Sequence, residues 1–92
     1  RARLQLGVAL EHAGDIAGAE AQLYEVLVLA PESHEAHFVL ATLLRRQNAL
    51  GEAEAEFRRA IDLKPDYGPA WINYAELLQR TSRIEAAAGA LD

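Results

Sequence analysis

The sequence contains no cysteine and no methionine, and its charge is weighted to one sign. Without cysteine, the chain has neither a disulfide nor a thiolate metal site to reinforce a small fold. The 9 Lys and Arg residues are outnumbered by 14 Asp and Glu residues, which gives a formal net charge of -5 at pH 7. An acidic surface repels phosphate backbones, so we expect no nucleic-acid partner.

Long apolar runs are also missing. No stretch reaches the roughly 18 apolar residues of a membrane-spanning helix, and no basic leader precedes an apolar segment. We therefore expect no membrane partner and a cytoplasmic location. Arg dominates the basic residues and Ala is abundant, a composition typical of a GC-rich bacterial genome. The absence of an initiator Met suggests a domain taken from a longer chain.

The sequence does contain an internal repeat. Pro31 and Pro65 stand 34 residues apart, and each follows an apolar segment. A shift of 34 residues also superimposes Ala19 on Ala53 and Ala87, Leu23 on Phe57 and Leu91, Leu6 on Leu40 and Tyr74, Gly7 on Ala41 and Ala75, Leu10 on Leu44 and Leu78, and Arg3 on His37 and Trp71. Small residues return where helices must touch closely, and large residues return where a gap must be filled.

Each repeat has the pattern of two helices. Apolar residues of the first segments recur at the i, i+3, i+4, i+7 spacing of an amphipathic helix. Gly14 suits a left-handed helix end, and Asn48 in the same register tolerates that conformation. The third copy has Ser82 there, followed by Glu85 in a capping-box pattern that opens a new helix. We predict helices over residues 2–13, 16–29, 34–46, 50–63, 68–80 and 84–92.

The repeat resembles the tetratricopeptide repeat (TPR). The residues that carry the resemblance are Trp71-x-x-Tyr74-Ala75-x-x-Leu78, then Leu40-Ala41-x-x-Leu44 with Ala53-x-x-x-Phe57 and Pro65, and Leu6-Gly7-x-x-Leu10 with Ala19-x-x-x-Leu23 and Pro31. Arg3 and His37 depart from it, because they replace the expected Trp. The resemblance implies an all-α fold, a right-handed α-solenoid of tandem antiparallel helix hairpins. We expect a single domain over 1–92, with repeats at about 1–33, 34–67 and a truncated 68–92.

The resemblance also implies where a protein or peptide partner binds, since the first helix of each hairpin lines the concave face in that family. Carried over to this chain, the groove consists of Leu4, Gln5, Val8, His12, Phe38, Val39, Thr42, Arg45, Arg46, Ile72, Asn73, Glu76 and Arg80. Chaperone-binding members hold a peptide carboxylate at positions that carry Leu4, Val8, Val39, Pro69 and Asn73 here. None of these is basic, so we do not expect that clamp. The predicted groove is apolar at its centre and basic at one rim.

Two features of this groove have alternative interpretations. Phe38 either anchors an apolar side chain of a peptide or packs against the neighbouring helix. Arg45, Arg46 and Arg80 either hold an acidic segment or a terminal carboxylate, or lie near helix ends because the helix macrodipole favours cations there.

The sequence gives little support for catalysis or for a cofactor. His34 and His37 share a helix face, but no third ligand stands in a fixed relation to them, so we predict core or interface histidines and no metal. Ser33 and Ser82 have the pattern of helix caps, without a base and an orienting acid. The glycines do not form a phosphate-binding loop. We expect no enzyme activity in this chain.

Two functions of different classes fit these observations. The first is an interaction module that binds a peptide or helix in the concave groove. The alternative is a structural docking or dimerisation region of a larger enzyme, such as a transferase, which would act through the ends of the array. We also expect apolar surface at Ile84, Ala88 and Leu91 to favour self-association. An RNA-binding helical repeat is disfavoured by the acidic charge.

Overall fold

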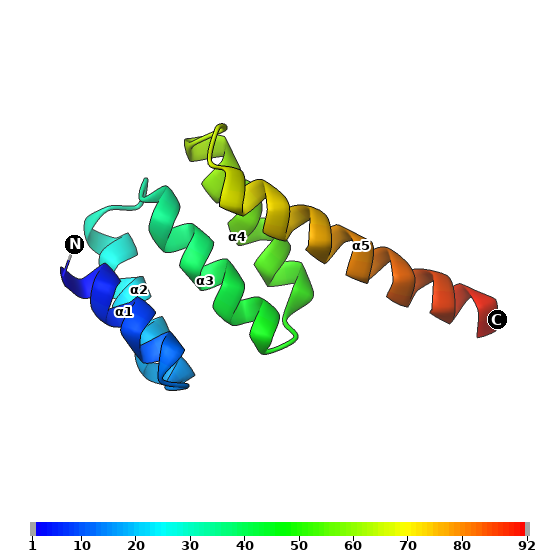
Figure 1. The fold of residues 1–92 in the computed structure, drawn as a ribbon, viewed down its shortest axis with the longest axis horizontal. Helices are drawn as coiled ribbons and strands as arrows, with labels where there is room; N and C mark the ends of the chain where they lie inside the picture. Colours follow the sequence, from blue (N-terminus) through cyan, green and yellow to red (C-terminus); the bar gives the residue numbers. More distant parts are fainter. Residues whose placement is uncertain (1, 92) are drawn as a thin grey trace.

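The computed structural model describes the backbone of residues 2–91 and the side chains of residues 4–83. The described backbone forms only helices and their connections. The helices are α1 (Ala2–His12), α2 (Ile16–Leu29), α3 (His34–Arg46), α4 (Leu50–Leu63) and α5 (Gly68–Leu91). Helices α1, α3 and α5 lie in one layer, and α2 and α4 lie in the other (Figure 1). The chain is an all-α helical-repeat solenoid, as predicted.

The turns within the two hairpins follow the predicted chemistry. Gly14 has a φ of 87° and Asn48 has a φ of 64°, and both positions follow the end of a first helix. The Asp15 carboxylate accepts a hydrogen bond from the Gly18 N–H at 3.0 Å, so it caps α2. These left-handed residues reverse the chain and bring the two helices of a hairpin side by side.

The core confirms much of the 34-residue register. Ala19 and Ala53 are fully buried, and so are Leu23 and Phe57 at the next shared position. Small residues in one row let the helices approach, and large residues in the other row fill the space between them. Most of the buried cluster comes from α2, α3 and α4.

One core assignment is wrong. Leu40 is 2% exposed, as its register predicts, but Leu6 in the same register is 47% exposed. Helix α3 packs against α2 and α4, whereas α1 packs against α2 and α3 alone among the described helices. Leu6 therefore lacks the outer helix of a preceding hairpin that covers Leu40.

The predicted break near Ser82 is also wrong. Helix α5 runs without interruption from Gly68–Leu91, so the third hairpin does not form, and its second half extends away from the other helices (Figure 1). The breaks at Gly14 and Asn48 use left-handed backbone, which Gly and Asn adopt at little cost. Ser82 lacks that tolerance, and the helix continues through it. The predicted apolar surface at Ile84, Ala88 and Leu91 lies outside the residues whose side chains are described.

None of the described helices combines the length and the apolar character needed to cross a membrane.

Candidate functional site

A hollow of about 400 Å³ opens on the layer formed by α1, α3 and α5. We call it the inner groove. Its lining consists of Leu4, Val8, Glu11, His12, Glu35, Phe38, Val39, Thr42, Arg45 and Tyr67. The apolar members come from facing sides of α1 and α3, because residues three and four apart on a helix share one face. The inner groove is an apolar floor with polar groups at its edges.

The structure brings together part of the predicted binding face. The predicted residues that line the hollow are Leu4, Val8, His12, Phe38, Val39, Thr42 and Arg45. Those that lie outside it are Gln5, Arg46, Ile72, Asn73, Glu76 and Arg80. The hollow thus lies between the first two repeats, and α5 contributes contacts at its side.

Sequence reasoning missed Glu35 and Tyr67. The prediction used only positions on the inner helices, whereas Tyr67 precedes α5 in the connecting loop. An aromatic residue directly before Gly68 and Pro69 was the available signal. Tyr67 is half-buried, and burial raises the pKa of its hydroxyl, with a further contribution from the Glu35 carboxylate. The hydroxyl is therefore a neutral hydrogen-bonding group beside the groove at physiological pH.

Phe38 is a structural part of the groove floor. Its ring meets Phe57 edge-on at a centroid distance of 6.0 Å and Tyr67 at 5.4 Å. Phe38 is half-buried and packs against both core clusters of the molecule. These contacts support packing against the neighbouring helices as its first role, while its remaining surface lines the hollow.

The arginines at the predicted basic rim are engaged by neighbouring helices. The Arg45 guanidinium donates to Asn73 Oδ1 at 3.0 Å and lies 3.8 Å from the Glu76 carboxylate. Arg46 donates to the Glu11 carbonyl at 3.3 Å and lies 3.5 Å from the Glu11 carboxylate. These contacts link α3 to α5 and α3 to α1. They favour a structural role for the two arginines over the capture of an acidic peptide.

Thr42 adds to the same layer of polar contacts. Its hydroxyl lies 2.7 Å from the Val39 carbonyl and 3.2 Å from the Glu11 carboxylate. On the next pair of helices, Arg80 donates to Asn48 Oδ1 at 3.0 Å. Exposed polar contacts are individually worth at most about 1 kcal/mol. Their consequence here is positional, because they fix the spacing of the inner helices that border the groove.

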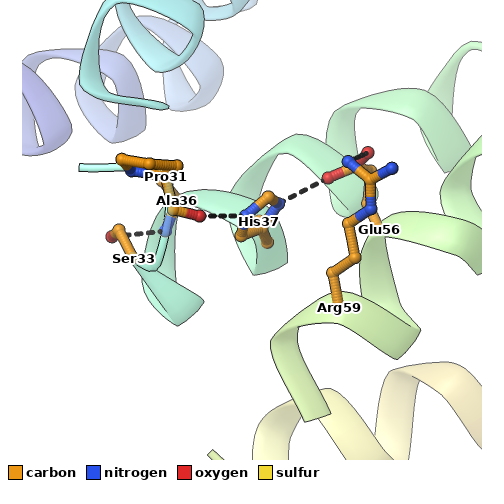
Figure 2. A network of polar contacts seen from close by, with 6 residues as sticks. All are labelled: Pro31, Ser33, Ala36, His37, Glu56 and Arg59. Carbon is orange, nitrogen blue, oxygen red and sulfur yellow. Dashed lines mark hydrogen bonds and ion pairs between the residues drawn. The ribbon is translucent and has the colours of Figure 1, made fainter. Parts of the chain in front are cut away.

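His37 belongs to the core, and its surroundings leave no free ring nitrogen. The side chain is 6% exposed. One ring nitrogen lies 2.6 Å from Glu56 Oε1, and the other lies 2.8 Å from the Pro31 carbonyl (Figure 2). The predicted core histidine is therefore confirmed. Within the part of the chain that the structure describes, no three His, Asp or Glu residues gather as a metal site would require.

The bond to Pro31 also repeats along the chain. Trp71 occupies the His37 register, and its indole N–H donates to the Pro65 carbonyl at 2.6 Å. Each ring thus ties the start of an inner helix to the proline that ends the preceding hairpin. The substitution of His for the expected Trp keeps this contact, because both rings carry a nitrogen at their edge.

The helix hairpins, the 34-residue register and the inner groove define a helical-repeat protein. A family model described as tetratricopeptide repeat matches residues 4–68. The chain belongs to the tetratricopeptide repeat family. It is also similar to protein O-mannosyl-transferase Tmtc3 of Drosophila melanogaster, with 39% identity over 62 residues. This match covers 67% of the chain but only 7% of that protein.

Proposed function

We propose that the chain is a protein–protein interaction module, which binds a segment of a partner protein in the inner groove and catalyses no reaction. The observation that carries the proposal is the hollow of about 400 Å³ with its apolar floor and polar edges. Ligand sites in proteins are commonly concave and mostly apolar, with a few polar groups that fix orientation. Membership of the tetratricopeptide repeat family supports it, because these repeats generally mediate protein–protein interaction.

The groove favours a partner that inserts an apolar side chain. Leu4, Val8 and Val39 supply aliphatic surface, and Phe38 supplies an aromatic edge. Arg45 is already engaged with α5, so it is a poor site for a partner's carboxylate. The polar groups at the edges then orient the backbone of the bound segment.

A peptide selection with a matched pair of variants tests this function. Peptides selected from a displayed library on the 92-residue chain are titrated against Val8→Gln and Val28→Gln. Val8 lines the groove, whereas Val28 is 81% exposed on the other layer. We expect Val8→Gln to weaken binding by about tenfold or more, because a polar amide replaces apolar lining. Val28→Gln should bind these peptides as the parent does.

Circular dichroism of both variants shows whether the helices are intact. A glutamate at Phe38 is a less informative change, because that ring contacts Phe57 and Tyr67. Peptides that bind the folded Val8→Gln chain as tightly as the parent would overturn the proposed groove.

A second candidate function is a docking or dimerisation region of a larger enzyme such as a transferase. The similarity to a 62-residue stretch of a protein O-mannosyl-transferase favours this alternative. Such a region acts through the ends of the array, where Leu6 and Trp71 are 47% and 49% exposed. Sedimentation equilibrium of the parent and of Leu6→Gln tests it. A dimer that Leu6→Gln dissociates supports docking through the ends, and a monomeric parent counts against dimerisation.

A further inference from the structure

A second hollow, of about 530 Å³, lies between α2 and α4, the two helices of the other layer. We call it the outer hollow. Its lining consists of Tyr24, Leu27, Pro31, His37, Leu40, Glu56, Arg59, Asp62 and Leu63. The described elements α2 and α4 do not pack against each other. The space between them is therefore open to a third element.

The border of the outer hollow is apolar on the α2 side. Tyr24 is 52% exposed, Val28 is 81% exposed and Leu29 is 71% exposed. Tyr24 and Val28 are four residues apart, so they lie on one face of α2. Across the hollow, Leu63 of α4 is 43% exposed. Exposed apolar side chains that gather beside a cavity are typical of an interaction site.

The repeat itself shows that solenoid packing does not require this apolar face. A shift of 34 residues places Arg58 at the position of Tyr24 and Asp62 at the position of Val28. Both Arg58 and Asp62 are exposed on α4. The same structural position thus accepts charged residues in one hairpin and carries large apolar residues in the other. The apolar face of α2 has a role other than packing within the array.

Carboxylates surround this apolar face. Burial raises the pKa of the Tyr24 hydroxyl, and the charges of Glu20, Glu52 and Glu56 raise it further. Asp62 forms no ion pair with any residue whose side chain is described. The cation in the lining, Arg59, lies 3.5 Å from Glu56 and is partly neutralised by it. The outer hollow is thus apolar at its centre and acidic at its edges.

Glu56 is held in place at the base of the hollow. One of its carboxylate oxygens bonds His37, and the other faces Arg59 (Figure 2). Its charge is therefore already shared between two partners. Glu52 and Asp62 remain as the carboxylates for an incoming cation, since they lack an ion pair within the described side chains.

We propose that the outer hollow binds a basic amphipathic helix of a partner protein. Apolar side chains of that helix contact Tyr24, Val28 and Leu63, and its Lys or Arg side chains pair with Glu52 and Asp62. A groove bordered by two helices receives the apolar face of a third in many complexes. A second copy of this chain fits less well, because the formal net charge of -5 would bring carboxylates against carboxylates.

Fluorescence anisotropy with two synthetic helical peptides tests the proposal. Both probes are about 18 residues long, or five turns, with Leu at i, i+3, i+4 and i+7. One carries Lys on the positions that flank the Leu stripe, and the other carries Glu. We expect the Lys probe to bind the parent chain at least about tenfold more tightly than the Glu probe. Added salt should reduce that preference, because it screens the charges.

Variants then place the Lys probe on α2. Tyr24→Arg introduces the residue that α4 carries at the same position, so we expect it to fold and to weaken binding by about tenfold or more. Val28→Gln should weaken the Lys probe, and Glu52→Gln should reduce its salt dependence. Val8→Gln, which alters the inner groove, should leave it unchanged. This pattern is the reverse of the one expected for the groove peptides, so the two sites succeed or fail separately.

Three results would overturn the proposal. Equal binding of the Lys and Glu probes would show that charge does not select the partner. Failure of the Lys probe to bind, or binding that is indifferent to Tyr24→Arg, would show that the outer hollow is not its site. Concentration-dependent dimerisation of the parent that Val28→Gln abolishes would assign this face to a second copy of the chain.

Discussion

The two complete hairpins, α1–α2 and α3–α4, share one sequence register but differ in how much of it is buried. In α3, Leu40, Leu43 and Leu44 are nearly inaccessible to solvent. In α1, Leu10 is half-buried and Leu6 is 47% exposed. Helix α3 is covered by outer helices on both sides, and α1 is covered on one. The burial of a repeat position is therefore set by its neighbouring repeats as well as by its residue type.

The outer helices differ in the opposite direction. Helix α4 shows charged residues where α2 shows Tyr24 and Val28, although both helices pack on their partners with the same small and large residues. Apolar character on α2 thus exceeds what packing of the hairpin uses. A difference between equivalent positions is informative, because the other repeat serves as a control for the demands of the fold.

The largest expected effect comes from Leu40→Ala compared with Leu6→Ala. Leu40 is almost fully buried, so its truncation should lower the free energy of unfolding by about 2–5 kcal/mol. Leu6→Ala should cost about 1 kcal/mol or less, since nearly half of that side chain is already in water. Urea unfolding of the two variants measures the difference. Equal losses would mean that the two hairpins are equally covered in solution.

Ala53→Leu should overpack the contact between α3 and α4. Ala53 is fully buried in the register of small residues, and a larger side chain there should cost about 1–3 kcal/mol. Ala55→Leu is the control on the same helix, because Ala55 is exposed. The melting temperatures of both variants are compared with that of the parent. No change for Ala53→Leu would count against the 34-residue register.

Gly7→Ala should make the first hairpin more like the second. The register has Ala41 and Ala75 at this position, and a Cβ at Gly7 would lie 3.5 Å from Leu23 Cγ, an ordinary contact. We expect a gain of about 0.5–1 kcal/mol, because Gly weakens a helix interior. Gly14→Ala should instead destabilise the chain by about 1 kcal/mol, since Gly14 has a φ of 87°. Stabilisation by both changes in a urea titration would contradict the assigned turn.

The smallest expected effect is on the ionisation of Tyr24, whose counterpart in α4 is Arg58. The ordinary pKa is 10.0, and burial and the nearby carboxylates raise it in the folded chain. A raised pKa favours the neutral hydroxyl on folding, so this contribution is present below pH 10.0 and is lost as pH rises through the folded-state pKa. Glu52→Gln should lower the pKa of Tyr24, as followed by NMR of labelled tyrosine rings. An unchanged pKa would remove Glu52 from the surroundings of Tyr24.

Much of the fold could be predicted from the sequence because the repeat states its rules more than once. Ala19 and Ala53 mark the close approach of paired helices, and Gly14 and Asn48 mark the turns. Ser82 misled the prediction, because a residue that can cap a helix can also lie within one. The break requires backbone that Ser does not favour, and the structure continues the helix.

The candidate sites were less predictable. The inner groove assigned to α1 and α3 contains most of the residues expected on those helices, but Tyr67 entered from a loop that no helical pattern describes. The outer hollow had no motif, because its lining comes from α2, α3 and α4 together. The partners of the arginines also depended on the spacing of adjacent repeats.

The sequence by itself determined the helical repeat, its period and its turn positions, since these follow from local backbone preferences and from a recurring pattern of small and large residues. Only the tertiary structure decided that Leu40 is core and Leu6 is surface, and that His37 bonds both Glu56 and Pro31. It alone brought Tyr24 of α2 and Leu63 of α4 to one hollow. The physical reason is that burial and long-range polar contacts depend on which helices pack together, which the pattern within one helix does not contain.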